Sequence, residues 1–235
     1  MEFDRFGSDA DPPLLFVLGW GNRPEHAPVK WLIDHLVEDG RYVHTATLPV
    51  HVTDVDAEWV RPVKRYAADL NDPAVLAHSA GGLTVAHADL DTQTTYLSPW
   101  WGFPPATDGP LLDLIAKLPT EQKVLPSSID NAELLGEHAT TRQITDSPDS
   151  VSPAFLRTVR QAHRDVPDID EDVVVFCSLS DRVVSTRAIG DRVPNDRIVL
   201  YDGGHELFSS RSRDRRLDTL LAVIEDGAAA LEPKP

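Results

Sequence analysis

Cysteine and long apolar segments are almost missing from this sequence. The single cysteine, Cys177, excludes an intramolecular disulfide and any metal site built from several cysteines. Its place inside an apolar run predicts a small buried core residue. The longest apolar runs, such as 14–18 and 173–176, are far too short to cross a bilayer. The first residues are acidic and lack the cationic start and apolar core of a secretory signal. We therefore expect a cytoplasmic protein that does not associate with a membrane.

Lysine is scarce, whereas carboxylates are abundant. The chain has 5 Lys and 17 Arg against 27 Asp and 11 Glu, which gives a net charge of −16. The acids are spread through every segment, and an acidic surface repels nucleic acid. Abundant Asp with scarce Lys resembles the proteins of salt-in halophilic archaea, where concentrated salt screens the repulsion between carboxylates. An acidic protein of a mesophile is the alternative. The two differ in whether the unfolding midpoint falls as KCl is removed.

Alternating apolar and amphipathic segments predict the fold class. Six segments have the length and composition of buried strands: 14–18, 42–48, 74–78, 94–98, 172–178 and 197–201. Helices are predicted near 28–39, 57–70, 83–90 and 214–225. This alternation implies an α/β protein with a mostly parallel sheet of about six strands and helices on both faces.

The alternation breaks between residues 99 and 165. This segment shows no strand pattern and contains short helical stretches near 110–118, 131–137 and 154–163. It is too long for a plain connection, so we expect a helical lid inserted after the fourth strand, over the carboxyl edge of the sheet. A long surface meander is the alternative. Residues 1–12 and 229–235 are expected to be an acidic N-terminal tail and a fraying C-terminal tail, which leaves a single domain over 13–228.

A serine stands where the third predicted strand gives way to a helix. The strand 74–78 is followed by Ser79, and glycines come at 81 and 82. Small residues on both sides suit a strained turn in which backbone atoms approach closely. The unpaired N–H groups of the helix's first turn point at whatever the serine attacks. Ala77-His78-Ser79-Ala80-Gly81 differs from the nucleophile-elbow pattern G-x-S-x-G only in its first residue. An ordinary loop that contains Ser and Gly is the alternative.

Other reactive groups follow other strands. Gly19-Trp20-Gly21 follows the first predicted strand, Asp181 the fifth and His205 the sixth. In an open parallel sheet, ligands bind outside the carboxyl ends of the strands, so these groups and Ser79 are expected at one edge. A hydroxyl, an imidazole, a carboxylate and a glycine turn are the parts of nucleophilic acyl chemistry.

Four segments resemble the successive blocks of the α/β-hydrolase fold superfamily. They are 15–21, 77–82, 178–184 and 202–208, and the order Ser, Asp, His is that family's order. The resemblance spans about 13–228 apart from the lid. It implies a serine hydrolase in which Ser79 is the nucleophile, His205 the general base and then acid, and Asp181 the group that holds the imidazole. It also implies an oxyanion hole made by the backbone N–H groups of Trp20 and Ala80.

The sequence departs from the family's pattern in three places. Leu18 stands where the family often has a histidine before Gly19, and Ala77 replaces the first glycine of the elbow. The usual antiparallel hairpin before the first strand is expected to be missing, because only about a dozen residues precede that strand. None of these changes removes a group of the implied triad.

Asp202 and His78 compete with these assignments. Asp202 is close to His205 in the sequence, but at a strand end its carboxylate is not expected to face the same imidazole edge, so Asp181 is preferred. The ring of His78 should point away from the Ser79 hydroxyl and be structural. The remaining histidines lack H-x-x-x-H or H-E-x-x-H spacing, and no metal or cofactor is expected. Serine rather than aspartate at the elbow argues against haloalkane dehalogenases and epoxide hydrolases.

Trp100, Trp101 and Phe103 are the candidate substrate-binding residues. They begin the predicted lid, and they either line an acyl or alcohol pocket or pack the lid on the core. We expect a small-molecule ester-like substrate and a monomer or homo-oligomer. Alternatives that use the same triad are an acyltransferase, a C–C bond hydrolase and a cofactor-free perhydrolase. A ligand-binding or sensing protein on a hydrolase scaffold is the alternative from another class.

Overall fold

A seven-stranded sheet forms the centre of the computed structural model, which describes residues 1–105, 107–127 and 131–232. Its spatial order is β1-β3-β2-β4-β5-β8-β9, and every neighbouring pair is parallel except β1 with β3. The strands are β1 (Glu2–Phe6), β2 (Pro13–Val17), β3 (Tyr42–Thr47), β4 (Ala74–His78), β5 (Thr94–Leu97), β8 (Val174–Cys177) and β9 (Ile198–Leu200). The predicted fold class, a mostly parallel sheet with helices on both faces, is confirmed.

The N-terminal residues differ from the predicted loose tail. β1 pairs antiparallel with β3, from Glu2 opposite Thr47 to Phe6 opposite Val43. The ring of Phe3 stacks on Tyr66 with the centroids 3.8 Å apart. The strand lies at the edge of the sheet, where charged side chains reach solvent, so its acidic sequence does not show the apolar pattern of a buried strand. One antiparallel strand therefore precedes β2, although residues 2–6 have no local strand signal.

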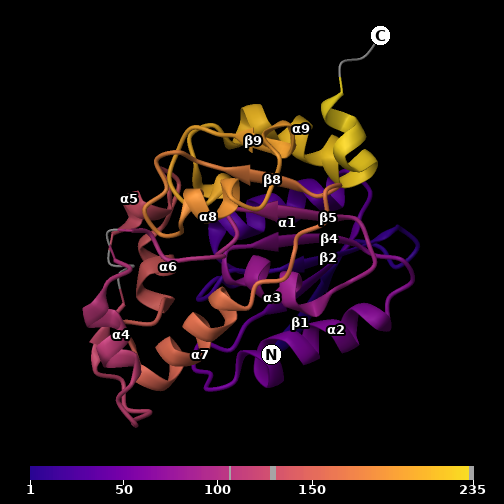
Figure 1. Ribbon diagram of the computed structural model, residues 1–235. Coiled ribbons are helices and arrows are strands. Elements are labelled where there is room, and N and C mark those ends of the chain that lie inside the picture. The colour runs from indigo at the N-terminus through magenta and orange to yellow at the C-terminus, as the bar shows by residue number, and fades with distance from the viewer. Residues whose placement is uncertain (106, 128–130, 233–235) are drawn as a thin grey trace.

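Two helical layers cover the sheet (Figure 1). Alternate residues of each central strand face opposite layers, so Leu14 and Phe16 pack with one core cluster while Leu15 and Val17 pack with the other. The first cluster contains buried residues of α1 (Ala27–Glu38) and α9 (Arg213–Asp226). The second contains those of α2 (Arg61–Ala68), α3 (Ala80–Ala88) and α7 (Pro153–Arg164). Burial on both faces explains why the central strands are continuous apolar runs.

The helix predicted over 57–70 is irregular at its start. Residues Asp56–Val60 form a π-helical turn, η1, and the α-helix α2 follows. Pro62 lacks the N–H that would bond to residue 58 in an α-helix, and its ring clashes with that carbonyl, so the backbone widens before the proline.

The insertion between β5 and β8 is helical, as predicted. It contains α4 (Pro110–Ala116), α5 (Ala132–Leu135), α6 (Thr141–Asp146) and α7. Two features were not predicted. One is the short antiparallel pair of β6 (Leu125–Pro126) and β7 (Ser150–Val151), and the other is α6, whose N-terminus has a capping box of Thr140 and Gln143. In Figure 1 the insertion lies at the end of the sheet toward which the central strands run.

The short α8 (Thr186–Gly190) and the 3₁₀ turn η2 (Asn195–Arg197) lead into β9. The C-terminal residues, by contrast, differ from the prediction of a fraying tail. After α9, the 3₁₀ helix η4 (Gly227–Leu231) continues the ordered chain, and Leu231 packs against the core cluster of α1 and α9. Residues 229–231 are therefore not a fraying tail, while 233–235 lie outside the described residues.

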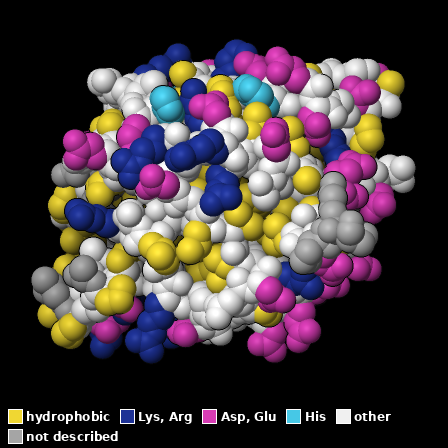
Figure 2. Space-filling view, turned by 90° about the horizontal axis from the view of Figure 1, so that it is seen from above, with side chains coloured by type: hydrophobic (Ala, Val, Ile, Leu, Met, Phe, Trp, Pro, Cys, Tyr) yellow, Lys and Arg dark blue, Asp and Glu magenta, His cyan; other side chains and the backbone are white. Residues whose placement is uncertain are grey.

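The surface carries the acidic charge of the sequence. Figure 2 shows Asp and Glu side chains scattered over one face, with a group of Lys and Arg side chains among them. No helix in the part of the chain that the structure describes is long and apolar enough to span a bilayer.

Candidate active site

Ser79 lies at the strand-to-helix turn that the sequence predicts. β4 ends at His78, α3 begins at Ala80, and Ser79 between them has φ 52° and ψ −118°. A positive φ is uncommon for a residue with a Cβ and stores of the order of 1–3 kcal/mol of strain. The turn requires Gly81, because a Cβ at that position would lie 2.2 Å from the carbonyl oxygen of Val17. The turn holds the serine at the carboxyl end of β4, beside the end of β2.

A hydrogen-bonded relay connects Ser79 to His205 and Asp181. Ser79 Oγ is 2.9 Å from His205 Nε2, and His205 Nδ1 is 2.8 Å from Asp181 Oδ2. Because a carboxylate only accepts, His205 Nδ1 carries the proton and Nε2 is left to accept from the Ser79 hydroxyl. The imidazole is therefore in the tautomer that can remove the serine proton.

Backbone contacts fix both partners of the relay. The second oxygen of Asp181 accepts from the N–H groups of Val183 and Val184, at 2.8 and 3.1 Å. The carbonyl of His205 accepts from the Tyr201 hydroxyl at 2.5 Å. The backbone N–H of His205 donates to the carbonyl of Leu134 in α5 at 2.9 Å. The insertion thus contributes directly to the position of the imidazole.

The charges of the relay reinforce one another. Burial alone would lower the pKa of His205, but the charge and hydrogen bond of Asp181, with the charge of Glu206, raise this pKa above its ordinary value. Burial alone would raise the pKa of Asp181, but the facing His205 and the N–H groups of Val184 and Val183 hold it below its ordinary value. Asp181 therefore stays ionised, and a proton arriving on His205 is stabilised.

A tight turn follows β2, and its residues Gly19 and Trp20 line the same pocket as Ser79. The N–H of Asn22 donates to the carbonyl of Gly19 at 3.0 Å, and Gly21 at position three of this turn has φ +82°, as a type II turn requires. The indole of Trp20 is fixed by its Nε1, which donates to Val50 O at 2.9 Å. Within residues 1–105, 107–127 and 131–232, the backbone N–H groups of Trp20 and Ala80 have no acceptor.

An apolar cavity of about 390 Å³ opens onto Ser79 and His205. Trp20 and Asn22 line it from the turn after β2, and the insertion supplies most of its wall. The apolar side chains of the insertion in this wall are Trp100, Phe103, Leu112, Leu125, Pro126, Leu134, Leu135, Val151, Phe155 and Leu156. Such a wall favours an apolar ligand segment next to a single polar reacting centre.

The comparison with solved structures agrees with this architecture. No known protein family matches the sequence, and no curated protein matches it. The structure is similar to a protein of Burkholderia ambifaria described as an α/β-hydrolase fold protein, with a TM-score of 0.60 and 15% identity over 93% of this chain and 92% of that chain. The chain has the α/β-hydrolase fold.

Enzymes of known activity are among the similar structures. A monoacylglycerol lipase of Paleococcus ferrophilus has a TM-score of 0.75 and 16% identity, over 97% of this chain and 98% of that chain. A soluble variant of the monoglyceride lipase of Saccharomyces cerevisiae has a TM-score of 0.70 and 14% identity, over 99% and 92%. An esterase of Exiguobacterium antarcticum has a TM-score of 0.65 and 14% identity, over 95% of each chain.

The three aromatic residues predicted to bind substrate occupy different places in this α/β-hydrolase fold. Trp100 and Phe103 line the cavity, with their rings edge to face and the centroids 5.3 Å apart. Trp101 is not among the described residues that line this cavity; it is 1% exposed and packs edge-on against Tyr96. Its Nε1 donates to the carbonyl of Gly82 at 3.3 Å. Trp101 therefore packs the start of the insertion onto the core, whereas Trp100 and Phe103 line the cavity.

The two competing residues have other hydrogen-bond or ion-pair partners. Asp202 is exposed and pairs with Arg211, whose Nη2 lies 2.5 Å from Asp202 Oδ1. His78 is 1% exposed, and its Nδ1 lies 3.0 Å from Asn22 Oδ1. The relay from Ser79 thus runs through His205 to Asp181. The ring of His78 lies beside that of His205, with the centroids 4.9 Å apart, but its side-chain hydrogen bond is to Asn22.

Three polar residues at the site were missed by the sequence reasoning. Asn22, Gln143 and Glu206 are buried, and both amides are hydrogen-bonded to Glu206 beside His205. These partners are 63 and 184 positions apart in the sequence, so no local pattern connects them. The only signal was the charged residue Glu206 between His205 and the apolar pair Leu207-Phe208, which is unusual in a segment that becomes buried.

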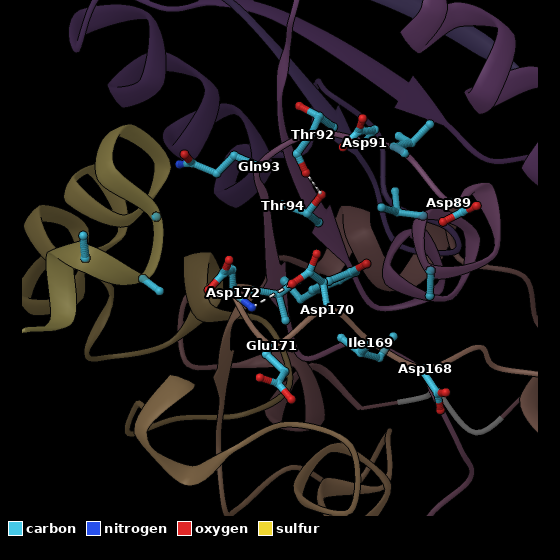
Figure 3. Close-up of a pocket in the computed structure, with 18 of the residues that line it drawn as sticks. Asp89, Asp91, Thr92, Gln93, Thr94, Asp168, Ile169, Asp170, Glu171 and Asp172 are labelled. Atoms are coloured by element: carbon cyan, nitrogen blue, oxygen red, sulfur yellow. Dashed lines mark hydrogen bonds between the residues drawn. The ribbon is translucent and has the colours of Figure 1, made fainter.

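Figure 3 shows a larger hollow of about 840 Å³, and Ser79 is not one of the described residues that line it. Residues before β5 and β8 line it, so it is at the amino edge of the sheet, opposite the relay. Its wall contains seven carboxylates: Asp89, Asp91, Asp168, Asp170, Glu171, Asp172 and Asp226. Among the described residues it holds no nucleophile hydrogen-bonded to a base.

Proposed function

We propose that this chain is a serine hydrolase that cleaves carboxylic esters through an acyl-enzyme on Ser79, without a metal or organic cofactor. The observation that carries the proposal is the relay from Ser79 through His205 to Asp181, which opens onto an apolar cavity. The backbone N–H groups of Trp20 and Ala80 have no acceptor in the described part of the chain. These are the nucleophile, the base, the group that orients the base, and the donors for a developing oxyanion.

Acylation begins with proton transfer from the Ser79 hydroxyl to His205 Nε2. The serine oxygen bonds to the carbonyl carbon of the ester, and the carbonyl oxygen becomes an oxyanion that the N–H groups of Trp20 and Ala80 bind. When this intermediate collapses, His205 returns the proton to the leaving alcohol. The acyl group is then an ester of Ser79.

Deacylation repeats these steps with water as the nucleophile. His205 removes a proton from water, the hydroxide adds to the acyl carbon, and the bond to Ser79 breaks as its oxygen takes the proton back. The products are an alcohol and a carboxylic acid. Asp181 stays ionised throughout and stabilises the imidazolium formed in each half-reaction.

The cavity favours an ester with an apolar acyl chain. Its wall beside Ser79 is largely aromatic and aliphatic, which suits a hydrocarbon segment. The similarity to two monoacylglycerol lipases supports the same substrate class. A small-molecule ester of this kind needs no nucleic acid or membrane-spanning partner.

The direct test is the hydrolysis of p-nitrophenyl acetate and butyrate by wild type and Ser79→Ala. We expect the variant to fall by at least about 10³-fold in kcat, because it has no nucleophile to acylate. The variant Ser180→Ala is the matched control, since Ser180 is an exposed hydroxyl outside the relay. Full activity of Ser79→Ala would overturn the proposal.

A further inference from the structure

Glu206 is a buried carboxylate beside the imidazole of the relay, and the mechanism above does not use it. It follows His205 in the chain and is 1% exposed. Its Oε1 accepts from Asn22 Nδ2 at 2.9 Å, and its Oε2 accepts from Gln143 Nε2 at 3.0 Å and from the hydroxyl of Ser209. A buried carboxylate is costly unless donors surround it, and three donors meet this one.

The orientation of each amide in this group is fixed by its neighbours. A carboxylate only accepts, so the nitrogens of Asn22 and Gln143 face Glu206. The oxygen of Gln143 accepts from the backbone N–H of Thr140 at 3.0 Å, at the start of α6. The oxygen of Asn22 faces His78 Nδ1 at 3.0 Å, so His78 carries its proton on Nδ1. Its Nε2 has no hydrogen-bond partner in the described part of the chain.

Two segments far apart in the sequence meet at Glu206. Asn22 closes the tight turn that carries the backbone N–H of Trp20, through its own N–H to the Gly19 carbonyl. Gln143 lies in α6 of the insertion. The backbone N–H of Glu206 donates to the Leu135 carbonyl of α5 at 2.8 Å, so a second element of the insertion reaches the same residue.

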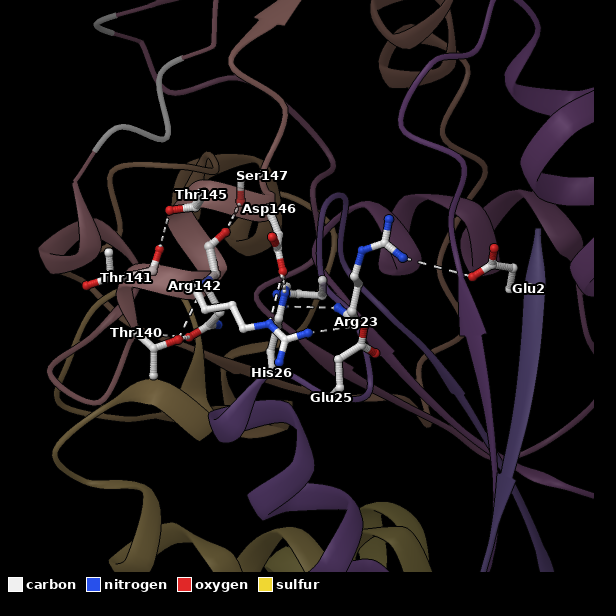
Figure 4. A network of polar contacts seen from close by, with 12 residues as sticks. Glu2, Arg23, Glu25, His26, Thr140, Thr141, Arg142, Thr145, Asp146 and Ser147 are labelled. Atoms are coloured by element: carbon white, nitrogen blue, oxygen red, sulfur yellow. Dashed lines mark hydrogen bonds and ion pairs between the residues drawn. The ribbon is translucent and has the colours of Figure 1, made fainter.

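A second contact joins α6 to the loop after β2 (Figure 4). The fully buried His26 lies with its Nε2 3.2 Å from Asp146 Oδ2, at the end of α6. Its Nδ1 faces the backbone N–H of Arg23 at 3.2 Å and accepts from it, so Nε2 carries the proton. Arg142 also reaches Asp146, at 3.3 Å. α6 is therefore held near both of its ends: Gln143 is hydrogen-bonded to Glu206, and Asp146 to His26 in the loop after β2.

We propose that Glu206 is a positioning residue for the ester hydrolysis proposed above: through Asn22 it holds the turn that presents the Trp20 N–H, and through Gln143 it holds α6 against that turn. The oxyanion site is then complete only when the insertion is docked. The proposal rests on the proposed function for its kinetic part. Its structural part, the polarity of the hydrogen bonds, stands without any activity.

Two substitutions separate positioning from simple packing. Glu206→Met keeps most of the side-chain volume but removes both acceptor oxygens. The turn after β2 then loses the hydrogen bond between Asn22 and residue 206. We expect kcat on p-nitrophenyl butyrate to fall by about 10–100-fold with little change in KM, because a displaced oxyanion donor weakens binding of the transition state only. Glu206→Gln keeps an acceptor for Gln143 and should retain more of the wild-type kcat than Glu206→Met.

Glu206→Gln also has a spectroscopic signature. The amide oxygen introduced by this substitution must face Gln143, so the introduced nitrogen faces Asn22, whose own amide must turn to accept. The nitrogen of Asn22 then faces His78 Nδ1, and the His78 proton must move to Nε2. ¹⁵N NMR of the histidine side chains should therefore show His78 protonated on Nδ1 in wild type and on Nε2 in Glu206→Gln.

Asp202→Asn is the matched control, because it removes one carboxylate close to His205 in the sequence but outside this group. It should change neither the His78 tautomer nor kcat. The proposal is overturned if Glu206→Met keeps wild-type kcat, or if its loss appears in KM alone. It is also overturned if wild-type His78 is protonated on Nε2. If wild type hydrolyses no ester, the proposed function fails, and the NMR measurement still decides whether Glu206 orders this group.

Discussion

The carboxylate of Asp181, and not that of Asp202, lies against the imidazole of His205. Asp181 Oδ2 is 2.8 Å from His205 Nδ1, while Asp202 is held at the surface by Arg211. The nearer residue in sequence is thus the wrong partner in space. Asp181 follows β8 and His205 follows β9, and these two strands are neighbours in the sheet.

Replacement of Asp181 should lower kcat strongly, whereas replacement of Asp202 should leave it almost unchanged. In Asp181→Asn the amide nitrogen faces His205 Nδ1 and favours the tautomer that cannot accept the Ser79 proton. The loss in kcat should be about 10⁴-fold, as is typical when a triad loses its carboxylate. Asp202→Asn should stay close to wild type. Steady-state kinetics on p-nitrophenyl butyrate measures both, and equal losses would show that Asp181 has no special role.

The activity should fall on the acid side as His205 takes up a proton. Only neutral imidazole can accept the Ser79 proton, and Asp181 raises the pKa of His205 above its ordinary value of 6.5. The rate should therefore rise with pH through an apparent pKa above 6.5 and then level off. The neighbouring His78 does not cause this step, because burial lowers its pKa well below 6.5. A pH–rate profile of kcat/KM that stays flat from about pH 5 to 8 would contradict this assignment.

Gly81→Ala should destabilise the fold at the turn that holds Ser79. The new methyl group would lie 2.2 Å from the Val17 carbonyl oxygen, so α3 and β2 must move apart. We expect a loss of about 1–3 kcal/mol or more in the free energy of unfolding, measured by chemical denaturation. Gly190→Ala in α8 is the control: the new Cβ would meet no atom of another part of the chain within 4 Å, so this variant should be at least as stable as wild type. Equal stability of the two variants would show that the turn has room for a side chain.

The unfolding midpoint should fall as KCl is removed. The net charge is −16, and seven carboxylates surround the hollow at the amino edge of the sheet (Figure 3). Salt shortens the Debye length to about 3 Å at 1 M and screens their repulsion. Thermal unfolding across a KCl series measures the effect, with sucrose as an uncharged control. A midpoint independent of KCl would favour the alternative of an acidic mesophilic protein.

The sheet was predictable because its signal is local. Central strands such as β2 and β8 are buried on both faces, so each is a continuous apolar run bounded by loop residues. The positions of Ser79, Asp181 and His205 after their strands follow from that assignment, since parallel strands end at one edge. β1 was missed for the same reason, because an edge strand tolerates charged residues such as Glu2 and Asp4.

The group around Glu206 was not predictable because its signal is not local. Each of its hydrogen bonds to Asn22 and Gln143 joins residues that only the folded chain brings together. The insertion poses a similar problem, since α6 depends on the capping box of Thr140 and Gln143 and on contacts with the loop after β2. The different roles of Trp100 and Trp101 follow from packing that two adjacent tryptophans do not reveal.

Covalent labelling of Ser79 tests the central claim most directly. Wild-type protein is treated with a fluorophosphonate, digested and analysed by mass spectrometry, with Ser79→Ala and heat-unfolded wild type alongside. The account predicts one adduct per folded chain, on the peptide that contains Ser79, and none in either control. An adduct on another residue, or no adduct on folded protein, would contradict it.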